Sequence, residues 1–109
     1  MYVSLIRRLR SQGYRVHLFF LWLPSVDLAL SRIRGRVVGG GHDVPEAVVR
    51  RRFDRSARNF FVYYRSLADS WVLFDSSEGL PAVIAVEKYG QVRIMKTERY
   101  EALLKQYGR

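Results

Sequence analysis

YRVHLFFLWLP, residues 14–24, gives the clearest indication of fold class in this 109-residue sequence. Its apolar residues stand at consecutive rather than alternate positions, which is typical of a strand buried on both faces of a parallel sheet. The run is far shorter than the roughly 20 apolar residues of a membrane-spanning helix. It therefore predicts a buried strand of an α/β fold, with no place in a membrane.

Helical patterns lie on both sides of this strand. Residues 2–12 predict a short helix that ends at Gly13, and Ser25 is the expected N-cap of a helix that runs to about Val38. A longer helix follows from about residue 46, with apolar residues three or four positions apart along one side. This seam comprises Val49, Phe53, Ala57, Phe60, Tyr64 and Leu67. At about 100° per residue, the opposite side carries Arg51, Arg55, Arg58 and Arg65.

The second half of the chain supplies the rest of the predicted sheet. WVLFD (71–75) indicates a second buried strand, residues 81–95 a hairpin that turns at Tyr89-Gly90, and residues 97–107 a closing helix. Strands joined by helical crossovers indicate a parallel α/β sheet. A doubly wound domain has about five or six such strands. We therefore expect residues 1–109 to form a single domain that corresponds to the second half of an α/β fold.

Charge is distributed unevenly along the chain. Residues 1–65 hold 13 of the 19 Lys and Arg and only four Asp and Glu, whereas residues 66–109 hold six of each. The whole net charge of +9 thus lies in the first part, which favours a polyanionic partner such as a nucleotide. The absence of cysteine favours a reducing compartment. The match to a signal peptide is weak, because His17 interrupts the apolar run. Both observations predict a cytoplasmic protein.

GGGHDVPEAVVRRRF, residues 39–53, is the segment with the clearest chemical pattern. Guanidinium groups bind phosphate oxygens and stabilise charge that develops in phosphoryl transfer, and a glycine hinge lets such a segment close over a nucleotide. Arg50, Arg51 and Arg52 are therefore candidate catalytic residues. For Arg55, Arg58 and Arg65 a solvated helix face explains the charges equally well. His42, with no His or Cys nearby, suits loop capping or a phosphate contact rather than a metal.

Asp75 and Ser76 lie at the carboxyl end of a predicted buried strand, where α/β folds place ligand contacts. An Asx turn with Ser76 and Ser77 is an equally good interpretation of this acid. The sequence contains no G-x-x-x-x-G-K-[ST] motif, and no Ser/His/Asp or Cys/His pattern is evident. We therefore do not expect this chain to be a catalyst by itself.

Three stretches resemble the zeta-toxin-like P-loop kinases and their predicted ATPase relatives in bacteria. They are GYRVHLFFLWLPSVDLALSRI (13–33), RVVGGGHDVPEAVVRRRF (36–53) and NFFVYYRSLADSWVLFDSS (59–77), and the resemblance extends to EKYGQVRI (87–94). It implies a partial P-loop kinase-like fold with parallel strands, helical crossovers, a lid-like segment at 36–58 and a carboxyl-terminal hairpin plus helix. It also implies ATP or GTP with Mg²⁺ as the nucleotide and a UDP-activated amino sugar as a substrate.

In this resemblance, Arg36 and Arg50 to Arg52 match the basic lid that closes on the phosphates, so Arg36 joins the candidate catalytic residues. His42 and Arg55 are candidate nucleotide-binding residues. Asp75 and Ser76 match the loop near the nucleotide base. The phosphate-binding loop and catalytic acid of the family would precede this chain, which matches the carboxyl-terminal half. The expected partners are therefore a nucleotide and either the other half of the domain or a second copy, which would cover the edge of the apolar strand.

Two other functions are also open to a chain with this sequence. A basic nucleic-acid-binding module could use Arg51, Arg55 and Arg58 on phosphates, although no recognised nucleic-acid motif is present. An antitoxin-like interaction partner of a full-length relative is also compatible with the sequence.

Overall fold

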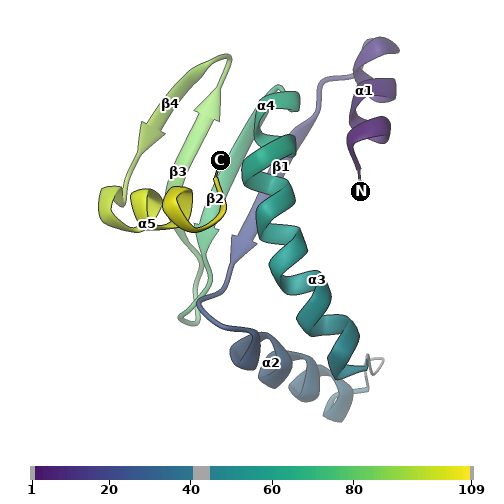
Figure 1. Ribbon diagram of the computed structural model, residues 1–109, viewed down its shortest axis with the longest axis vertical. Helices are drawn as coiled ribbons and strands as arrows, with labels where there is room; N and C mark the ends of the chain where they lie inside the picture. The colour runs from purple at the N-terminus through teal and green to yellow at the C-terminus, as the bar shows by residue number, and fades with distance from the viewer. Residues whose placement is uncertain (1, 41–44, 109) are drawn as a thin grey trace.

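The computed structural model describes residues 2–40 and 45–108. The elements follow one another as α1 (Val3–Ser11), β1 (His17–Trp22), α2 (Val26–Val38), α3 (Glu46–Asn59), the π-helical turn η1 (Phe60–Tyr64), α4 (Arg65–Leu67), β2 (Ser70–Asp75), β3 (Ala82–Lys88), β4 (Gln91–Ile94) and α5 (Thr97–Tyr107) (Figure 1). The predicted hairpin and closing helix are confirmed. His42 and the adjoining part of the glycine segment lie outside the described residues.

The four strands form one mixed sheet in the order β1-β2-β3-β4. β1 and β2 are parallel, with His17 opposite Ser70 and Trp22 opposite Asp75. The crossover between them runs through α2 and α3, while β2, β3 and β4 are antiparallel neighbours. A mixed α/β architecture with one parallel strand pair is therefore established for the described residues.

β1 differs from the expected strand that is buried on both faces. Leu18, Phe20 and Trp22 face the helices, but Phe19 is 70% exposed and Leu21 is 54% exposed. β1 is an edge strand, and α3, η1 and α5 contribute their buried residues to a core on one face of the sheet (Figure 1). The consecutive apolar residues of β1 thus belong to two different surfaces, one covered and one open.

The core is built around stacked and edge-on aromatic rings. Phe60 stacks on Phe20 with ring centroids 4.8 Å apart and meets Trp71 edge-on at 5.6 Å. Tyr107 of α5 stacks on Phe61 at 6.1 Å. Because these rings come from β1, β2, η1 and α5, their burial holds the helical layer against the sheet.

The π-helical turn η1 changes the direction in which the next side chains point. A π-helical turn closes i→i+5 hydrogen bonds and so contains an extra residue relative to an α-helical turn. The prediction that Arg65 shares the solvent side of the long helix with Arg51 is therefore wrong. Arg65 is half-buried, donates a hydrogen bond to the carbonyl of Phe61 at 3.2 Å and lies 5.2 Å from the centre of the Phe61 ring.

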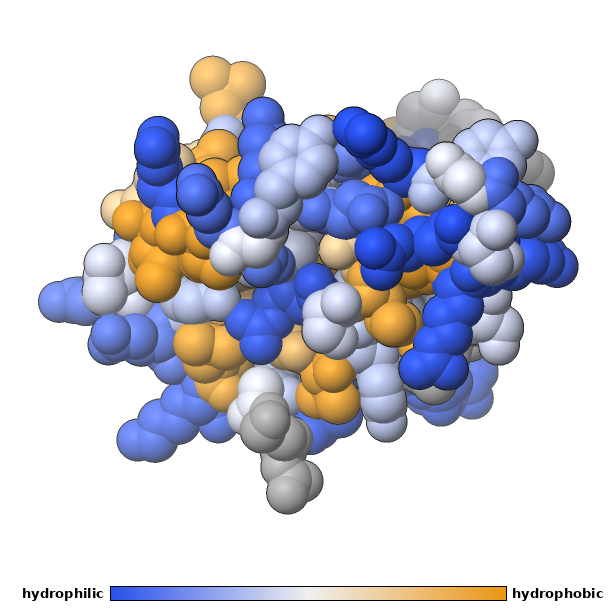
Figure 2. Space-filling model, turned by 90° about the horizontal axis from the view of Figure 1, so that it is seen from above, coloured by the Kyte–Doolittle hydropathy of each residue, from blue (hydrophilic) through white to orange (hydrophobic). Residues whose placement is uncertain are grey.

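The surface is mixed rather than uniformly polar. Figure 2 shows hydrophobic side chains reaching the surface between hydrophilic ones on the face seen from above. The most exposed large hydrophobic residues among those described include Leu80 and Val38, at 87% and 90%. Within the described part of the chain, no helix is both long and apolar enough to cross a membrane.

Candidate functional site

The carboxyl ends of the parallel strands β1 and β2 lie side by side, and an arginine of α2 binds the residue that follows β2. The backbone N–H of Ser76 donates to the carbonyl of Trp22 at 2.8 Å. Arg32 of α2 donates to the hydroxyl of Ser76 at 3.3 Å and also to its carbonyl oxygen. Asp75 and Ser76 are both buried. This end of the sheet is where α/β folds commonly bind ligands.

Asp75 is held from several directions. Its Oδ1 accepts a hydrogen bond from the backbone N–H of Ser77 at 2.9 Å, so the Asx turn is confirmed. Its Oδ2 lies 3.8 Å from the ammonium nitrogen of Lys96. Burial by itself would raise the pKa of Asp75, but the hydrogen bonds from Ser77 and the charges of Lys96 and Arg99 outweigh burial and lower that pKa. Asp75 is therefore ionised at neutral pH, with its charge balanced locally.

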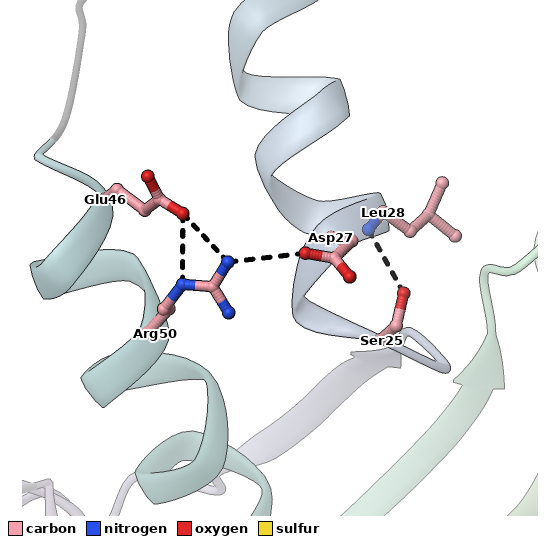
Figure 3. A network of polar contacts seen from close by, with 5 residues as sticks. All are labelled: Ser25, Asp27, Leu28, Glu46 and Arg50. Atoms are coloured by element: carbon pink, nitrogen blue, oxygen red, sulfur yellow. Dashed lines mark hydrogen bonds and ion pairs between the residues drawn. The ribbon is translucent and has the colours of Figure 1, made fainter.

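Arg50 joins the two helices that flank the glycine segment (Figure 3). Its Nη2 lies 2.8 Å from the carboxylate of Glu46, one turn earlier on α3, and 3.4 Å from the carboxylate of Asp27 on α2. The hydrogen bond from Arg50 is the main cause of a lowered Glu46 pKa, and Glu46 in turn raises the pKa of Arg50. Figure 3 also shows Ser25, whose hydroxyl accepts from the N–H of Leu28 at 3.2 Å and confirms the predicted N-cap.

An apolar pocket of about 310 Å³ lies between the end of β1, α2 and α3. Its walls are mainly aliphatic and aromatic. They are formed by Phe20, Leu21, Trp22, Leu23, Ala29, Ile33, Val49, Phe53 and Ala57, together with Arg52 and Ser56. Arg52 is thus the one cationic residue among those that line it. Such a combination of apolar walls and a few polar groups is typical of small-molecule sites.

A second, more polar cleft of about 470 Å³ shares Arg52 and Ser56 with the apolar pocket. It is lined by Tyr2, Arg52, Arg55, Ser56, Asn59 and Tyr64. Two of these lining residues are joined by a hydrogen bond, because the backbone N–H of Tyr2 donates to the Tyr64 hydroxyl at 3.0 Å. Arg52 and Ser56 line both hollows, so an anionic group bound to Arg52 could extend into either.

The consecutive arginines are separated rather than gathered. Neighbouring residues on an α-helix point about 100° apart, so three in a row cannot converge on one ligand. All three are exposed, but Arg50 turns to Glu46 and Asp27, Arg52 lines the two hollows, and Arg51 lines neither hollow. Arg36 is exposed near the end of α2. The structure therefore brings Arg52 together with Arg55, and not with its sequence neighbours.

Some residues of this region were not identified from the sequence. Ser56 and Asn59 follow Arg52 at helical intervals of four and three, so the spacing could have indicated them as one strip of α3. Arg32 lies in α2 among other arginines, and its position in the sequence gave no comparable signal. Within residues 2–40 and 45–108, no three His, Cys, Asp or Glu side chains form a group that could hold a metal ion.

Comparisons with known proteins add one relative. An uncharacterized protein of Haemophilus influenzae is 36% identical to this chain over 53 residues, which is 46% of this chain and 38% of that protein. The chain thus spans well under half of the length of the curated relative that it matches. No protein-family model matches the chain, and no solved structure matches it. The relative has no described activity that could be compared with the site.

Proposed function

We propose that this chain is the carboxyl-terminal, phosphate-contacting part of a zeta-toxin-like P-loop phosphotransferase. The observation that carries the proposal is the position of Arg52, which lines both the apolar pocket and the arginine-containing cleft. The apolar pocket is of a kind that accepts a base or sugar ring, and the cleft offers two guanidinium groups for phosphate oxygens. The ligand class is therefore a nucleoside phosphate, with ATP, GTP or a UDP-activated sugar as the specific candidates.

The proposed role of the arginines is electrostatic. Guanidinium groups that are already in place stabilise the negative charge on a phosphoryl group during transfer, which is the main contribution of protein residues to this class of reaction. Arg52 and Arg55 are assigned that role. Arg36 and Arg51 line neither hollow. In this proposal they contact the phosphates only after a rearrangement of the lid-like segment 36–58, to which Arg52 and Arg55 also belong.

Arg50 has a different place in this proposal. Its ion pairs with Glu46 and Asp27 connect α3 to α2. In this proposal Arg50 therefore fixes the position of α3 relative to α2 and does not contact the phosphate. Within residues 2–40 and 45–108, no three His, Cys, Asp or Glu side chains are grouped as a metal site would need. The proposal for this part of the chain therefore concerns phosphate contacts alone. The carboxylate of Asp75 is already balanced by Lys96 and Ser77.

The proposal is tested by calorimetric titration of the chain with Mg-ATP and with UDP-N-acetylglucosamine, at low and at physiological salt. We expect saturable binding of at least one ligand with a dissociation constant below millimolar. Arg52→Ala should weaken it at least tenfold, whereas Arg58→Ala, which removes an exposed arginine outside both hollows, should leave it within twofold. Absence of binding, or equal losses from the two variants, would contradict the proposed role of Arg52.

A basic nucleic-acid-binding module is the second candidate, and the exposure of Arg51, Arg55 and Arg58 along α3 favours it. Binding of this kind depends on the number of phosphate contacts, and affinity falls by roughly one power of salt concentration for each contact. Arg58→Ala and Arg55→Ala would then weaken binding to a similar extent. Comparing Arg55→Ala with Arg58→Ala thus separates the two functions, because the nucleotide proposal predicts that, of these two variants, only Arg55→Ala weakens binding.

A further inference from the structure

The two edge strands of the sheet differ in how they are protected from pairing with another chain. β4 is four residues long, carries Arg93 near its middle and is exposed throughout. β1, HLFFLW, is longer and contains no proline, glycine, lysine or arginine. Natural proteins usually shorten, charge or bend their edge strands, because unpaired backbone groups recruit further strands. β4 is short and carries a charge, whereas β1 is neither shortened nor charged.

The backbone of β1 can be divided between its two sides. The carbonyl of Val16 accepts from the N–H of Ser70 at 3.3 Å, and the carbonyl of Trp22 accepts from the N–H of Ser76 at 2.8 Å. Because the N–H and C=O of one strand residue point to the same side, residues at even positions bond to β2. His17, Phe19 and Leu21 therefore direct their N–H and C=O groups to the open edge.

The same residues carry the exposed apolar side chains. Phe19 is 70% exposed and Leu21 is 54% exposed, and the ring of Phe19 lies 6.2 Å from that of Phe74 on β2. The unpaired backbone groups and the apolar side chains thus belong to one continuous surface. It consists of the open edge of β1 and the adjoining sheet face, and we call it the β1 edge.

We propose that the β1 edge binds the β1 edge of a second copy of this chain, antiparallel and around a twofold axis. A register centred on Phe20 sets Phe19 opposite Leu21 of the second copy, and a register centred on Phe19 sets that ring against its own counterpart. In both registers the backbone groups of the odd-numbered residues face each other and form hydrogen bonds. Two four-stranded sheets then join into one, and the exposed side chains pack across the axis.

The charge distribution restricts where a second copy of this basic chain can approach. The chain has a net charge of +9, so two copies repel each other over most of their surfaces. VHLFFLWLPSV, residues 16–26, contains no Asp, Glu, Lys or Arg. The β1 edge is therefore a surface where two such basic molecules approach with little repulsion. Added salt should strengthen this association, or leave it unchanged, because screening weakens the remaining repulsion.

The first experiment measures the mass of the chain by sedimentation equilibrium over a wide concentration range. We expect a monomer–dimer equilibrium that Phe19→Lys weakens at least tenfold. The matched control is Leu80→Lys, which adds the same charge at an exposed apolar residue between β2 and β3 and should leave the equilibrium unchanged. Circular dichroism would verify that both variants keep the wild-type secondary structure.

Several outcomes would overturn the proposal. A wild-type monomer at several hundred micromolar would show that the β1 edge does not bind a second copy. A dimer that Phe19→Lys leaves intact would place the interface elsewhere, and an open-ended assembly would exclude twofold pairing.

A second experiment locates the interface and its register. The chain has no cysteine, so single cysteines can be introduced without background. With a short thiol-to-thiol crosslinker, Phe19→Cys should give covalent dimers much faster than Val92→Cys, which places the thiol on the opposite edge strand β4. Mixing Phe19→Cys with Leu21→Cys distinguishes the two registers. Equal rates for the two edges would indicate random collisions and contradict the proposal.

Discussion

The Nη1 of Arg65 donates a hydrogen bond to the hydroxyl oxygen of Tyr100 at 2.6 Å. Arg65 begins α4, directly after the π-helical turn, and Tyr100 lies in α5, so this contact joins the two helical segments that cover the sheet. The guanidinium carbon also lies 6.0 Å from the centre of the Trp71 ring. An arginine that the helical periodicity assigns to solvent is thus part of the packing between α5 and the core.

We expect Arg65→Ala to lower the free energy of unfolding by about 1.5–3 kcal/mol, because it removes a charged hydrogen-bond donor and its contacts with two rings. Tyr100→Phe should cost about 1 kcal/mol. The double variant should cost less than the sum of the two, since the residues act on each other. Urea unfolding measures all three. Arg58→Ala, an exposed arginine of α3, is the control and should change stability by less than about 0.5 kcal/mol.

Local patterns predicted most elements of this fold well. The turn at Tyr89-Gly90, the strand at Ser70–Asp75 and the helix at Thr97–Tyr107 follow from turn residues, apolar runs and helical spacing. These signals act over a few residues and do not depend on the rest of the chain. The π-helical turn and the open face of β1 could not be predicted in this way. Both depend on how distant elements pack, which a periodicity does not contain.

The candidate site was predicted in part for the same reason. The sequence indicated Arg50 to Arg52 as a unit, but the helical rotation between neighbours sends Arg50 to Asp27 and Arg52 to the two hollows. Asp75 and Ser76 do lie at the carboxyl end of a strand beside β1. Whether any of these residues contacts a nucleotide stays a prediction. His42 lies outside the described residues.

The turn of the hairpin contains a residue that is poorly suited to its backbone. Tyr89 has φ of 50° and Gly90 has φ of 82°, which is the pattern of a type I′ turn, in which Asn-Gly is the preferred pair. Tyr89→Asn should therefore raise the free energy of unfolding by about 0.5–1 kcal/mol, in spite of the lost 3.3 Å contact between Arg15 and the Tyr89 hydroxyl. Thermal and urea unfolding measure the gain. Tyr14→Asn, at an exposed tyrosine whose φ is not positive, should show none.

The Glu46–Arg50 contact predicts a measurable shift in acidity. Glu46 should titrate below the ordinary pKa of a glutamate, because the hydrogen bond and charge of Arg50 stabilise its carboxylate. Carbon-detected NMR of the side-chain carboxyl group measures this pKa directly. In Arg50→Gln the pKa should return toward its ordinary value, whereas in Arg51→Gln it should stay low. An unshifted Glu46 in the wild type would show that Arg50 is not held by this pair and is available to a ligand.

Asp69 predicts how stability responds to acid. Its Oδ2 accepts the backbone N–H of Val16 at 2.7 Å, and its Oδ1 lies 3.1 Å from Arg10, so it connects α1 and the start of β1 to the start of β2. The hydrogen bond from Val16 is the main cause of its lowered pKa, and Arg10 adds to it. A carboxyl group with a pKa lower in the folded than in the unfolded chain stabilises the fold above the unfolded value of about 3.9. That stabilisation is lost as the pH falls through the folded pKa.

The test compares the wild type with Asp69→Asn by urea unfolding from pH 7 to pH 3. Asparagine keeps the shape of the side chain and can still accept from Val16, but it carries no charge and does not titrate. The variant should be less stable at pH 7, and the difference should shrink as the pH falls, since protonated Asp69 then resembles asparagine. Glu101→Gln, at an exposed residue of α5, is the control and should follow the wild type. A difference between wild type and Asp69→Asn that stays constant over this range would show that the charge of Asp69 does not anchor α1.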